Sequence, residues 1–296
     1  MSRMPYAQTV KSQSILERSF KMIDLHIHST CSDGTFTPKE IVHKVIEKNL
    51  YGFSLTDHDT VDGISEILAM NLPKDLKFIP GIEISCDTLH REIHILGYGI
   101  DCKNKDLNTT LNDLRDKRMK RNLDMIELFQ KDGFPVTLEK LQHGDPDTVI
   151  TRAHFSRVLV EEGICTSREQ AFSKYLGEKC KYYIPKPFFD PKDCLKLILD
   201  AGGIPVLAHP FLYKFSNKDT KQLIHDLKDY GLAGIEVYHS SHHKGQIAKL
   251  REWKKEYHLL ASGGSDFHGT NKPDIDIGTG RGTLYVPDHL LDELLR

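Results

Sequence analysis

One pattern in the sequence limits the possible folds of this chain more than any other feature. Predicted strands alternate with predicted helices, and the strands end in histidine or carboxylate side chains. Residues 22–30 (MIDLHIHST) form an alternating strand in which His26 and His28 share a face. A helix then begins with Pro38 at its first position and Glu40 in a capping box. The further predicted strands are residues 51–56, 77–85, 92–98, 204–208, 234–238 and 259–262. This alternation indicates an α/β barrel or a layered sheet, whose chemistry lies at the carboxyl ends of the strands.

The alternation is interrupted in the middle of the chain. Residues 107–129 have the apolar spacing of a helix, and no convincing strand pattern returns until after Pro191. The first residues of the chain show no sustained period. The expected organisation is an N-terminal tail at residues 1–21, a barrel formed by residues 22–100 and 191–296, and an inserted helical domain at residues 101–190.

Composition narrows the class of protein. The chain has 296 residues, with 40 basic and 42 acidic side chains and a net charge of −2. A strong basic excess is typical of architectural nucleic-acid binders, so we expect no long duplex partner. No apolar run approaches the roughly 18 to 20 residues of a membrane span, and no secretory signal pattern occurs. The expectation is a cytoplasmic protein that binds no membrane.

Cysteine and histidine usage indicate the kind of chemistry. The six cysteines are scattered without a CxxC pair, which argues against a thiolate zinc site and against a disulfide framework. Histidine is abundant, with 16 in the chain, and many histidines stand beside Asp or Glu in short apolar runs. This pattern favours imidazole and carboxylate chemistry, meaning a metal site or acid–base catalysis.

Nine polar side chains at predicted strand ends form the candidate site. One HxH sequence alone is equally well explained by two polar residues on the wet face of a strand. That explanation does not account for six motifs at the ends of successive predicted strands, namely HxH, DHD, GIE, HILGY, AHP and SDFH. Because strand ends converge in a barrel, residues that are far apart in the sequence would meet there. The candidate metal ligands are His26, His28, Asp33, His58, Glu83, His94, His209, Asp266 and His268.

The order of these motifs resembles the polymerase and histidinol phosphatase (PHP) superfamily. The strings that carry the resemblance are DLHIHSTCSDG, LTDHDTVDG, PGIEIS, HILGY, LAHP, GIEVYHSSH and SGGSDFHG, in order over residues 22–282. Within the superfamily the chain is most similar to stand-alone phosphoesterases of nucleotides and short oligonucleotides, the TrpH-like or nucleoside bisphosphate phosphatase-like group. The resemblance implies a distorted (β/α)7 TIM-like barrel with a small inserted helical domain, holding two to three divalent cations.

The resemblance also divides the nine candidates among the cations. Nitrogen and oxygen ligands suit Zn²⁺, Mn²⁺ or Fe²⁺, and the sequence does not choose among them. Glu83 belongs to two sets and would bridge two cations, which offsets their mutual repulsion. The implied sets are His26, His28, Glu83 and Asp266 for one ion, Asp33, His58 and His268 for a second, and Glu83, His94 and His209 for a third.

The implied activity is hydrolysis of phosphate esters by a metal-bound water. A bound cation lowers the pKa of water toward about 7, giving hydroxide, and paired cations hold the attacking and leaving oxygens at phosphorus. No nucleophilic Ser or Cys is required, and a histidine can protonate the leaving alkoxide. The implied substrates are nucleoside mono- or 3′,5′-bisphosphates, or the 5′ ends of short oligonucleotides.

Basic side chains outside the nine are candidate phosphate contacts. Arg152 and His154 resemble the R-x-H segment that this group places beside the substrate phosphate, and the planar fork of Arg suits bidentate phosphate binding. The alternative is an ordinary helix-start Arg and a surface His. Arg118 is a weaker candidate, because a solvated helix face explains Arg118 and Arg121 better. Lys272, after the DFHG loop, is either a phosphate contact or an ordinary loop lysine.

Residues 238–243 supply one more candidate. Three histidines lie in a polar loop, which favours a surface interpretation for His239, His242 and His243. We expect Tyr238 instead to contribute to the substrate pocket.

Two alternatives to a nucleotide phosphoesterase stay open. The first is a histidinol phosphate phosphatase, because the choice of substrate depends on the pocket wall built by the inserted residues. The second is a non-catalytic metal-binding PHP module that supports a partner protein. Loss of ligands would indicate such a module, whereas all nine candidate positions are filled here.

Overall fold

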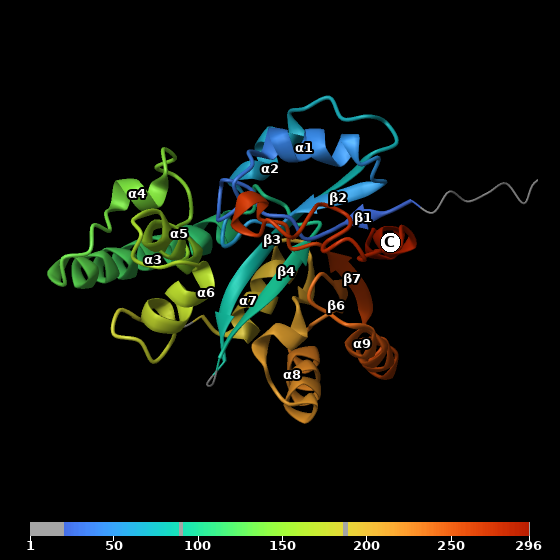
Figure 1. Cartoon of the computed structure of the whole chain (residues 1–296). Helices are drawn as coiled ribbons and strands as arrows, with labels where there is room; N and C mark the ends of the chain where they lie inside the picture. The colour runs from blue at the N-terminus through green and yellow to red at the C-terminus, as the bar shows by residue number, and fades with distance from the viewer. Residues whose placement is uncertain (1–20, 89–90, 186–188, 296) are drawn as a thin grey trace, which may run out of the picture.

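A computed structural model describes residues 21–88, 91–185 and 189–295, and it has the predicted α/β architecture. Seven strands pair in chain order to form one sheet that curls into a nearly closed barrel (Figure 1). Backbone hydrogen bonds join its two edges, since Leu25 N donates to Gly263 O at 3.1 Å and His28 N to Phe267 O at 3.0 Å. The strands are β1 (Ile23–Asp24), β2 (Gly52–Leu55), β3 (Lys77–Asp87), β4 (Glu92–Tyr98), β5 (Ile204–Leu207), β6 (Gly234–His239) and β7 (Leu260–Gly264).

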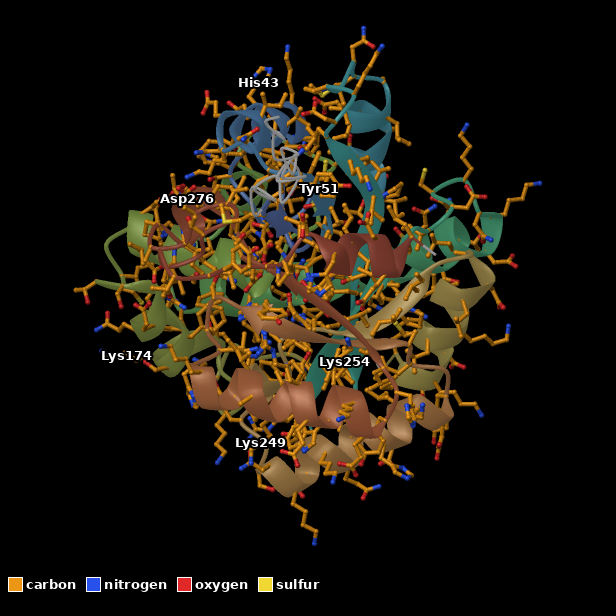
Figure 2. All side chains as sticks on the ribbon, turned by 90° about the vertical axis from the view of Figure 1, so that its right-hand side faces the viewer. His43, Tyr51, Lys174, Lys249, Lys254 and Asp276 are labelled. Atoms are coloured by element: carbon orange, nitrogen blue, oxygen red, sulfur yellow. The ribbon has the colours of Figure 1, made fainter. Side chains whose placement is uncertain are left out.

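Helices cover the outside of this barrel. The predicted capping box at the first of them is confirmed, because the Thr37 side chain accepts from Glu40 N while the Glu40 carboxylate accepts from Thr37 N. His43 on this helix is exposed and extends from the surface (Figure 2). The barrel helices are α1 (Pro38–Glu47), α2 (Asp62–Leu68), α7 (Pro191–Asp200), α8 (Asn217–Asp229), α9 (Lys244–Glu256) and α10 (His289–Leu294), with short 3₁₀ turns η2 (Pro210–Tyr213) and η3 (Gly269–Asn271).

The distortion of the barrel lies at β4, which runs antiparallel to both β3 and β5. Only four residues of sequence separate β3 from β4, so the two antiparallel strands form a hairpin. Residues near the start of β4 therefore lie at the same end of the barrel as the carboxyl ends of the parallel strands. His94 reaches the site in this way, and Glu83 lies within β3, so the expectation of strand-end positions was wrong for these two residues.

A group of helices between β4 and α7 extends to one side of the barrel (Figure 1). It has its own cluster of buried side chains, among them Met125, Phe129, Phe155 and Leu159, whereas Leu107 at the start of its first helix packs into the barrel core. These helices are α3 (Lys105–Lys131), α4 (Leu138–Gln142), α5 (Arg152–Glu161), α6 (Arg168–Ala171) and the π-helical turn η1 (Phe172–Leu176).

Two further expectations concern what the chain lacks. The six cysteines all lie in described segments and all are free thiols. Within the described segments, no helix combines the length and the apolar character that crossing a bilayer requires. The expected tail at residues 1–21 falls outside the described residues, apart from Lys21.

Candidate metal centre

The first two histidines of the site are fixed by the closure of the barrel. His26 and His28 follow β1 and are fully buried. Asp24 holds the neighbouring backbone in place, because its carboxylate accepts from Ser265 N at 2.8 Å and from Gly278 N at 2.7 Å. The HxH sequence is therefore anchored to the segment after β7, which carries the last ligand candidates.

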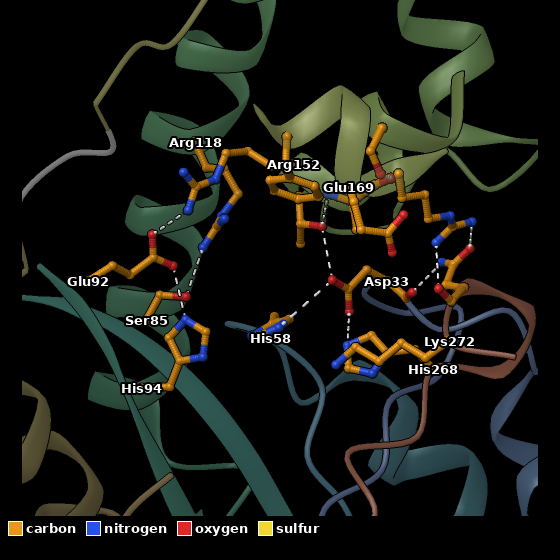
Figure 3. A pocket seen from close by; sticks show the side chains of 16 residues that line it. Asp33, His58, Ser85, Glu92, His94, Arg118, Arg152, Glu169, His268 and Lys272 are labelled. Carbon is orange, nitrogen blue, oxygen red and sulfur yellow. Dashed lines mark hydrogen bonds and ion pairs between the residues drawn. The ribbon is translucent and has the colours of Figure 1, made fainter. Parts of the chain in front are cut away.

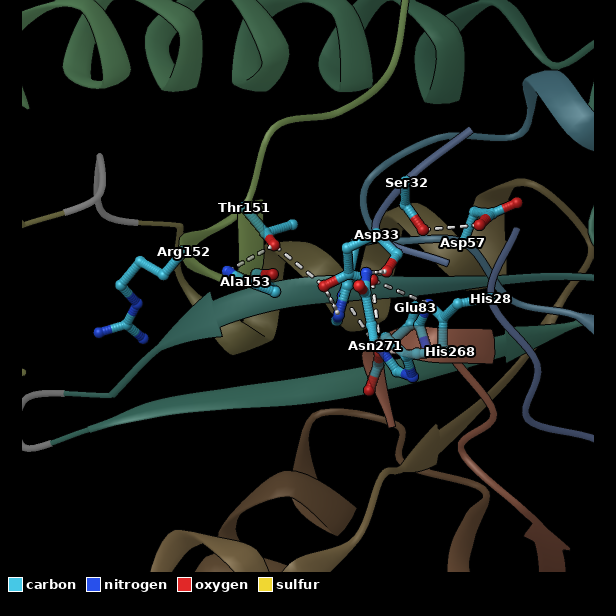
Figure 4. A network of polar contacts seen from close by, with 12 residues as sticks. His28, Ser32, Asp33, Asp57, Glu83, Thr151, Arg152, Ala153, His268 and Asn271 are labelled. Atoms are coloured by element: carbon cyan, nitrogen blue, oxygen red, sulfur yellow. Dashed lines mark hydrogen bonds and ion pairs between the residues drawn. The ribbon is translucent and has the colours of Figure 1, made fainter. Parts of the chain in front are cut away.

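Asp33 is brought back to the site by a tight loop. Asp57 accepts hydrogen bonds from the Ser29 and Ser32 hydroxyls, each at 2.6 Å, and so closes this loop (Figure 4). Gly34 is required within it, since a Cβ there would lie 2.3 Å from the carbonyl oxygen of His28. The side chain of Asp33 then faces the imidazoles of the site.

Glu83 lies at the centre of the cluster and is 1% exposed. One carboxylate oxygen lies 2.9 Å from His209 Nε2 and 3.0 Å from His94 Nδ1. The other lies 3.1 Å from His58 Nδ1, 3.3 Å from His28 Nε2 and 3.4 Å from His26 Nε2. Five imidazoles thus surround one carboxylate.

Asp266 and His268 complete the cluster from the segment after β7. Asp266 Oδ1 lies 3.5 Å from His28 Nε2 and 3.4 Å from His268 Nδ1. Its other oxygen accepts from Lys272 Nζ at 2.6 Å. His268 Nε2 in turn lies 3.1 Å from Asp33 Oδ1. This contact brings the segment after β7 next to the loop after β1.

All nine predicted side chains lie in four overlapping groups whose potential ligand atoms are within 4.8 Å of one another. These groups share residues, so one contiguous site results rather than separate clusters. They are His28, Asp33, His58 and His268; His26, Glu83 and His209; His26, His28 and Asp266; and His58, Glu83 and His94.

The donor set fits divalent cations. Several buried nitrogen and oxygen atoms of the cluster have no hydrogen-bond partner, including both ring nitrogens of His28, His26 Nε2 and Asp33 Oδ1. Leaving such atoms unpaired in the interior is costly, and a bound cation would satisfy them. Imidazole and carboxylate without thiolate suit Zn²⁺, Mn²⁺ or Fe²⁺.

Electrostatic coupling keeps the carboxylates ionised. Burial alone would raise the pKa of Asp33 and Glu83, but the surrounding histidines hold both pKa values well below their ordinary range. Burial disfavours the charged form of His28, yet Asp266 and Glu83 outweigh it and raise the pKa of His28 to about 9. The pKa of His94 is likewise raised to about 9, against burial, chiefly by Glu83. The site therefore carries negative charge that protons or cations must balance.

A cavity of about 510 Å³ opens beside the cluster, and we call it the arginine pocket. Its lining combines candidate ligands, among them Asp33 and His268, with cationic side chains from the inserted helices and from the loop after β7 (Figure 3). The size lies in the range of about 300 to 1,000 Å³ that small-molecule sites occupy. The cationic lining residues are Arg118, Arg152, Arg168 and Lys272.

Comparison with known proteins identifies this arrangement. A family model described as the PHP domain matches residues 24–185. The chain belongs to the PHP family. A 5′-3′ exoribonuclease of Haemophilus influenzae is 35% identical over 84% of this chain and 90% of its own length. A 3′,5′-nucleoside bisphosphate phosphatase of Chromobacterium violaceum is 32% identical over 86% of this chain and 90% of its own length.

A solved structure supports the same assignment. It comes from Bifidobacterium adolescentis, is assigned as a metal-dependent phosphoesterase, and superposes with a TM-score of 0.82 at 29% identity. It covers 93% of this chain and 96% of its own. The predicted fold and enzyme class are therefore confirmed, and this PHP protein is a metal-dependent phosphoesterase.

The structure corrects the interpretation of the arginines in this PHP protein. Arg118 and Arg121 do not lie on a solvated face, since Arg118 is 6% exposed and Arg121 is 4% exposed. Arg118 forms an ion pair with Asp59 and lines the arginine pocket, where Arg152 pairs with Glu92 at 3.1 Å (Figure 3). Burial, followed by the charge of Arg121, lowers the pKa of Arg118 to about 9.

The two residues of the R-x-H segment, Arg152 and His154, have different surroundings in the structure. Arg152 begins α5 and lines the arginine pocket, as expected for a phosphate contact. His154 is buried, which excludes the surface interpretation, and its Nδ1 accepts from Thr151 N at 3.0 Å to complete a capping box. Burial lowers the pKa of His154 to about 4. His154 is not among the described residues that line the pocket, so its expected substrate contact is not supported.

The structure does not support the expected pocket position of Tyr238 either, because Tyr238 is not among the described residues that line the arginine pocket. A β-bulge between Glu236 and Tyr238 shifts the alternation of β6 by one residue, so that Tyr238 lies outside the site and its hydroxyl accepts from Arg251 at 2.6 Å. His239 takes the inward position, is 1% exposed, and lies 3.3 Å from Asp266 Oδ2. His242 is buried as well, whereas His243 is exposed and caps α9.

Sequence reasoning missed Glu236, which orients two candidate ligands of the PHP site. Its carboxylate lies 2.9 Å from His26 Nδ1 and accepts from His209 N at 2.7 Å. Such outer carboxylates fix the ring orientation of metal-binding histidines. The signal was present in the sequence, because a glutamate inside the apolar strand 234–238 is rarely buried without a partner.

Proposed function

We propose that this PHP phosphoesterase hydrolyses phosphate esters of nucleotides, either nucleoside mono- or 3′,5′-bisphosphates or the 5′ ends of short oligonucleotides. The observation that carries the proposal is the arginine pocket, in which cations of the inserted helices face the nine candidate ligands. The names of the Haemophilus and Chromobacterium relatives, an exoribonuclease and a nucleoside bisphosphate phosphatase, support the same substrate class.

We propose two to three divalent cations, held by the three ligand sets that the resemblance implies. The overlapping groups of potential ligand atoms support this number, because Glu83 and the early histidines are each shared between groups. When bound, the cations supply Lewis acidity and a water molecule of lowered pKa. Glu83 would balance the charge of two neighbouring ions, and Glu236 would keep His26 in its binding orientation.

Arg152 would orient the substrate phosphate. The Arg152 guanidinium lines the pocket and pairs with Glu92. Glu92 in turn lies 2.9 Å from His94 Nε2. Arg152 therefore lies near the candidate ligands without belonging to a ligand set. A planar fork binds phosphate oxygens in pairs and fixes their direction. Arg118 and Arg121 add charge nearby, and an anionic substrate would relieve the repulsion among these three buried or half-buried arginines.

The division of the chain is part of this proposal. Residues 101–190 would form an inserted domain that provides the substrate wall, and residues 22–100 and 191–296 would form the barrel that holds the cations. The separate cluster of buried side chains around Phe129 and Leu159 supports the division.

Phosphate release from a substrate panel tests the proposed function. Chelated protein resupplied with Mn²⁺, Zn²⁺ or Fe²⁺ is incubated with mononucleotides, 3′,5′-bisphosphonucleotides, 5′-phosphorylated oligonucleotides and histidinol phosphate. We expect metal-dependent turnover of the nucleotide classes. Turnover of histidinol phosphate alone would favour a histidinol phosphate phosphatase. If no substrate of the panel is hydrolysed although cations are bound in stoichiometric amounts, the non-catalytic module is favoured.

A further inference from the structure

One aromatic side chain of the inserted helices does not join the aromatic cluster of that region. Phe129, Phe134, Tyr175 and Tyr182 contact one another through their rings, with Phe129 and Tyr182 stacked at 4.1 Å between centroids. Phe172 makes no ring contact with any described residue and is 38% exposed. A single exposed apolar residue is common on protein surfaces, so its surroundings decide whether it has a role.

Phe172 faces the functional site rather than open surface. It lines the arginine pocket and also the adjoining cavity of about 460 Å³, which reaches Glu83, His209 and Asp266. Within the described lining of the arginine pocket it is the only large apolar side chain. The phenyl ring therefore lines both cavities, together with cationic side chains and candidate metal ligands.

The local backbone explains why Phe172 is not buried. Helix α6 passes at Phe172 into the π-helical turn η1, which changes the direction of successive side chains relative to an α-helix. Ala171 and Leu176 are buried in the cluster of the inserted helices, whereas Phe172 and Lys174 are exposed (Lys174 is labelled in Figure 2). Short π-helical turns of this kind are frequent at functional sites.

The charges around Phe172 define the ligand that would cover it. Arg152, Arg168 and Lys272 line the same pocket, and Arg168 is held there by donating to Asn271 O at 2.9 Å. The lining also contains the carboxylates of Asp33, Glu92 and Glu169, of which Glu92 is paired with Arg152. A ligand with an anionic group for the cations and a flat apolar ring for Phe172 would match this lining. A nucleotide has both, because its phosphate matches the cations and its base has a π-face that stacks on aromatic side chains.

We propose that Phe172 is the stacking platform for the nucleobase of the substrate. The platform accepts any base, since stacking uses the π-face and not the hydrogen-bonding edge. Together with the arginines it selects phosphate esters that carry a base over esters of a bare sugar. The inference rests on the proposed function and deepens it, because it names the part of the substrate that the inserted helices recognise.

A matched pair of substrates tests the platform. Adenosine 3′,5′-bisphosphate and the same ribose 3,5-bisphosphate without its base are compared with wild-type protein, Phe172→Ala, Phe172→Leu and Phe172→Trp. We expect Phe172→Ala to raise KM for the base-bearing substrate about tenfold, with kcat and the base-free substrate little changed. Phe172→Leu should resemble Phe172→Ala, and Phe172→Trp should retain wild-type discrimination.

Two controls separate the possible failures. Leu123→Ala removes another exposed apolar side chain, on α3 and outside the described lining of both cavities, and it should leave discrimination unchanged. Thermal unfolding and metal content, measured for every variant, should match the wild type. If the wild type hydrolyses nucleotides but Phe172→Ala discriminates equally well, the platform is wrong and the proposed function stands. If the wild type hydrolyses no nucleotide, the proposed function itself fails.

Discussion

The carboxyl end of the barrel and the inserted helices contribute different kinds of side chain to one site. Every residue of the four potential metal-binding groups comes from the barrel, and most are buried to near-completion. The inserted helices contribute none of these residues, but they supply Arg118, Arg152, Arg168 and Phe172 to the arginine pocket. The difference teaches that the barrel holds the candidate metal ligands, whereas the insertion supplies most of the cationic pocket wall, to which the proposed function assigns substrate selection.

The two regions are nevertheless joined at Asp33. The Thr151 hydroxyl, at the start of α5, donates to Asp33 Oδ2 at 3.0 Å and so leaves Oδ1 directed at the histidines (Figure 4). Thr148 donates to the backbone of the same loop, at Ser32 O, over 2.7 Å. Asn271 donates to Asp33 O at 2.6 Å and is itself bonded by Arg168. The insertion therefore supports a candidate ligand as well as the pocket wall.

The largest expected effect is on the barrel side. Glu83→Gln removes the charge that five imidazoles surround, so cation binding should be lost and kcat/KM should fall by at least about 10²-fold, because a catalytic metal is worth several kcal/mol. Metal content and phosphate release are measured on the same samples. Glu47→Gln, an exposed carboxylate on α1, is the control. Wild-type metal content in Glu83→Gln would remove this residue from the ligand set.

A substitution in the inserted helices should have a smaller effect, on substrate affinity and not on cation binding. Arg152→Ala should raise KM about 10- to 100-fold with unchanged metal content, because charged hydrogen bonds contribute about 1.5 to 3 kcal/mol. Arg152→Lys should recover only part of this, since lysine lacks the fork. Arg251→Ala, which loses an exposed arginine bound to Tyr238, should behave as wild type. Unchanged kinetics in Arg152→Ala would return this residue to a structural role.

The contact between the regions gives an intermediate test. Thr151→Val should weaken cation binding at the Asp33 group about tenfold, because residues that orient metal ligands typically contribute about 10- to 100-fold in affinity. Thr151→Ser should retain wild-type affinity. Thr137→Val loses only the cap of α4 and serves as the matched control, with a similar stability cost of about 1 kcal/mol. Equal metal affinity in Thr151→Val and Thr137→Val would show that the regions are not coupled through Asp33.

The last expected effect is a pH dependence of cation binding. The pKa values of His28 and His94 are raised to about 9, so in the metal-free protein both imidazoles are protonated at pH 7. A cation must displace these protons, hence its affinity should rise as pH increases toward 9 and fall as pH decreases. Calorimetry in two buffers of different ionisation enthalpy measures the protons released. Binding without proton release at pH 7 would contradict the assignment.

The barrel side was largely predictable because its signal is local. An HxH after an alternating strand, or a capping box at Thr37, depends on residues close in sequence, and convergence of strand ends then follows from the fold class. Glu83 and His94 were predicted as ligands, although the reversal of β4 that brings His94 to the site was not visible in its alternating pattern.

The insertion and the β6 segment were less predictable because tertiary contacts decide them. Arg118 lies in a charged run that resembles a solvated face, and only packing against the barrel brings it to Asp59. Tyr238 and His239 exchanged their expected positions because a bulge, which period-two reasoning does not detect, changes the direction of one residue. Phe172 looks like an ordinary helix residue until the π-helical turn is known.

Phosphate release from adenosine 3′,5′-bisphosphate, measured on the chelated protein before and after Mn²⁺ is returned, tests the central claim most directly. The account predicts no release before the cation is added and restored release afterwards, with Glu83→Gln silent in both conditions. Equal release by the chelated protein, or silence after Mn²⁺ has bound in stoichiometric amounts, would contradict it.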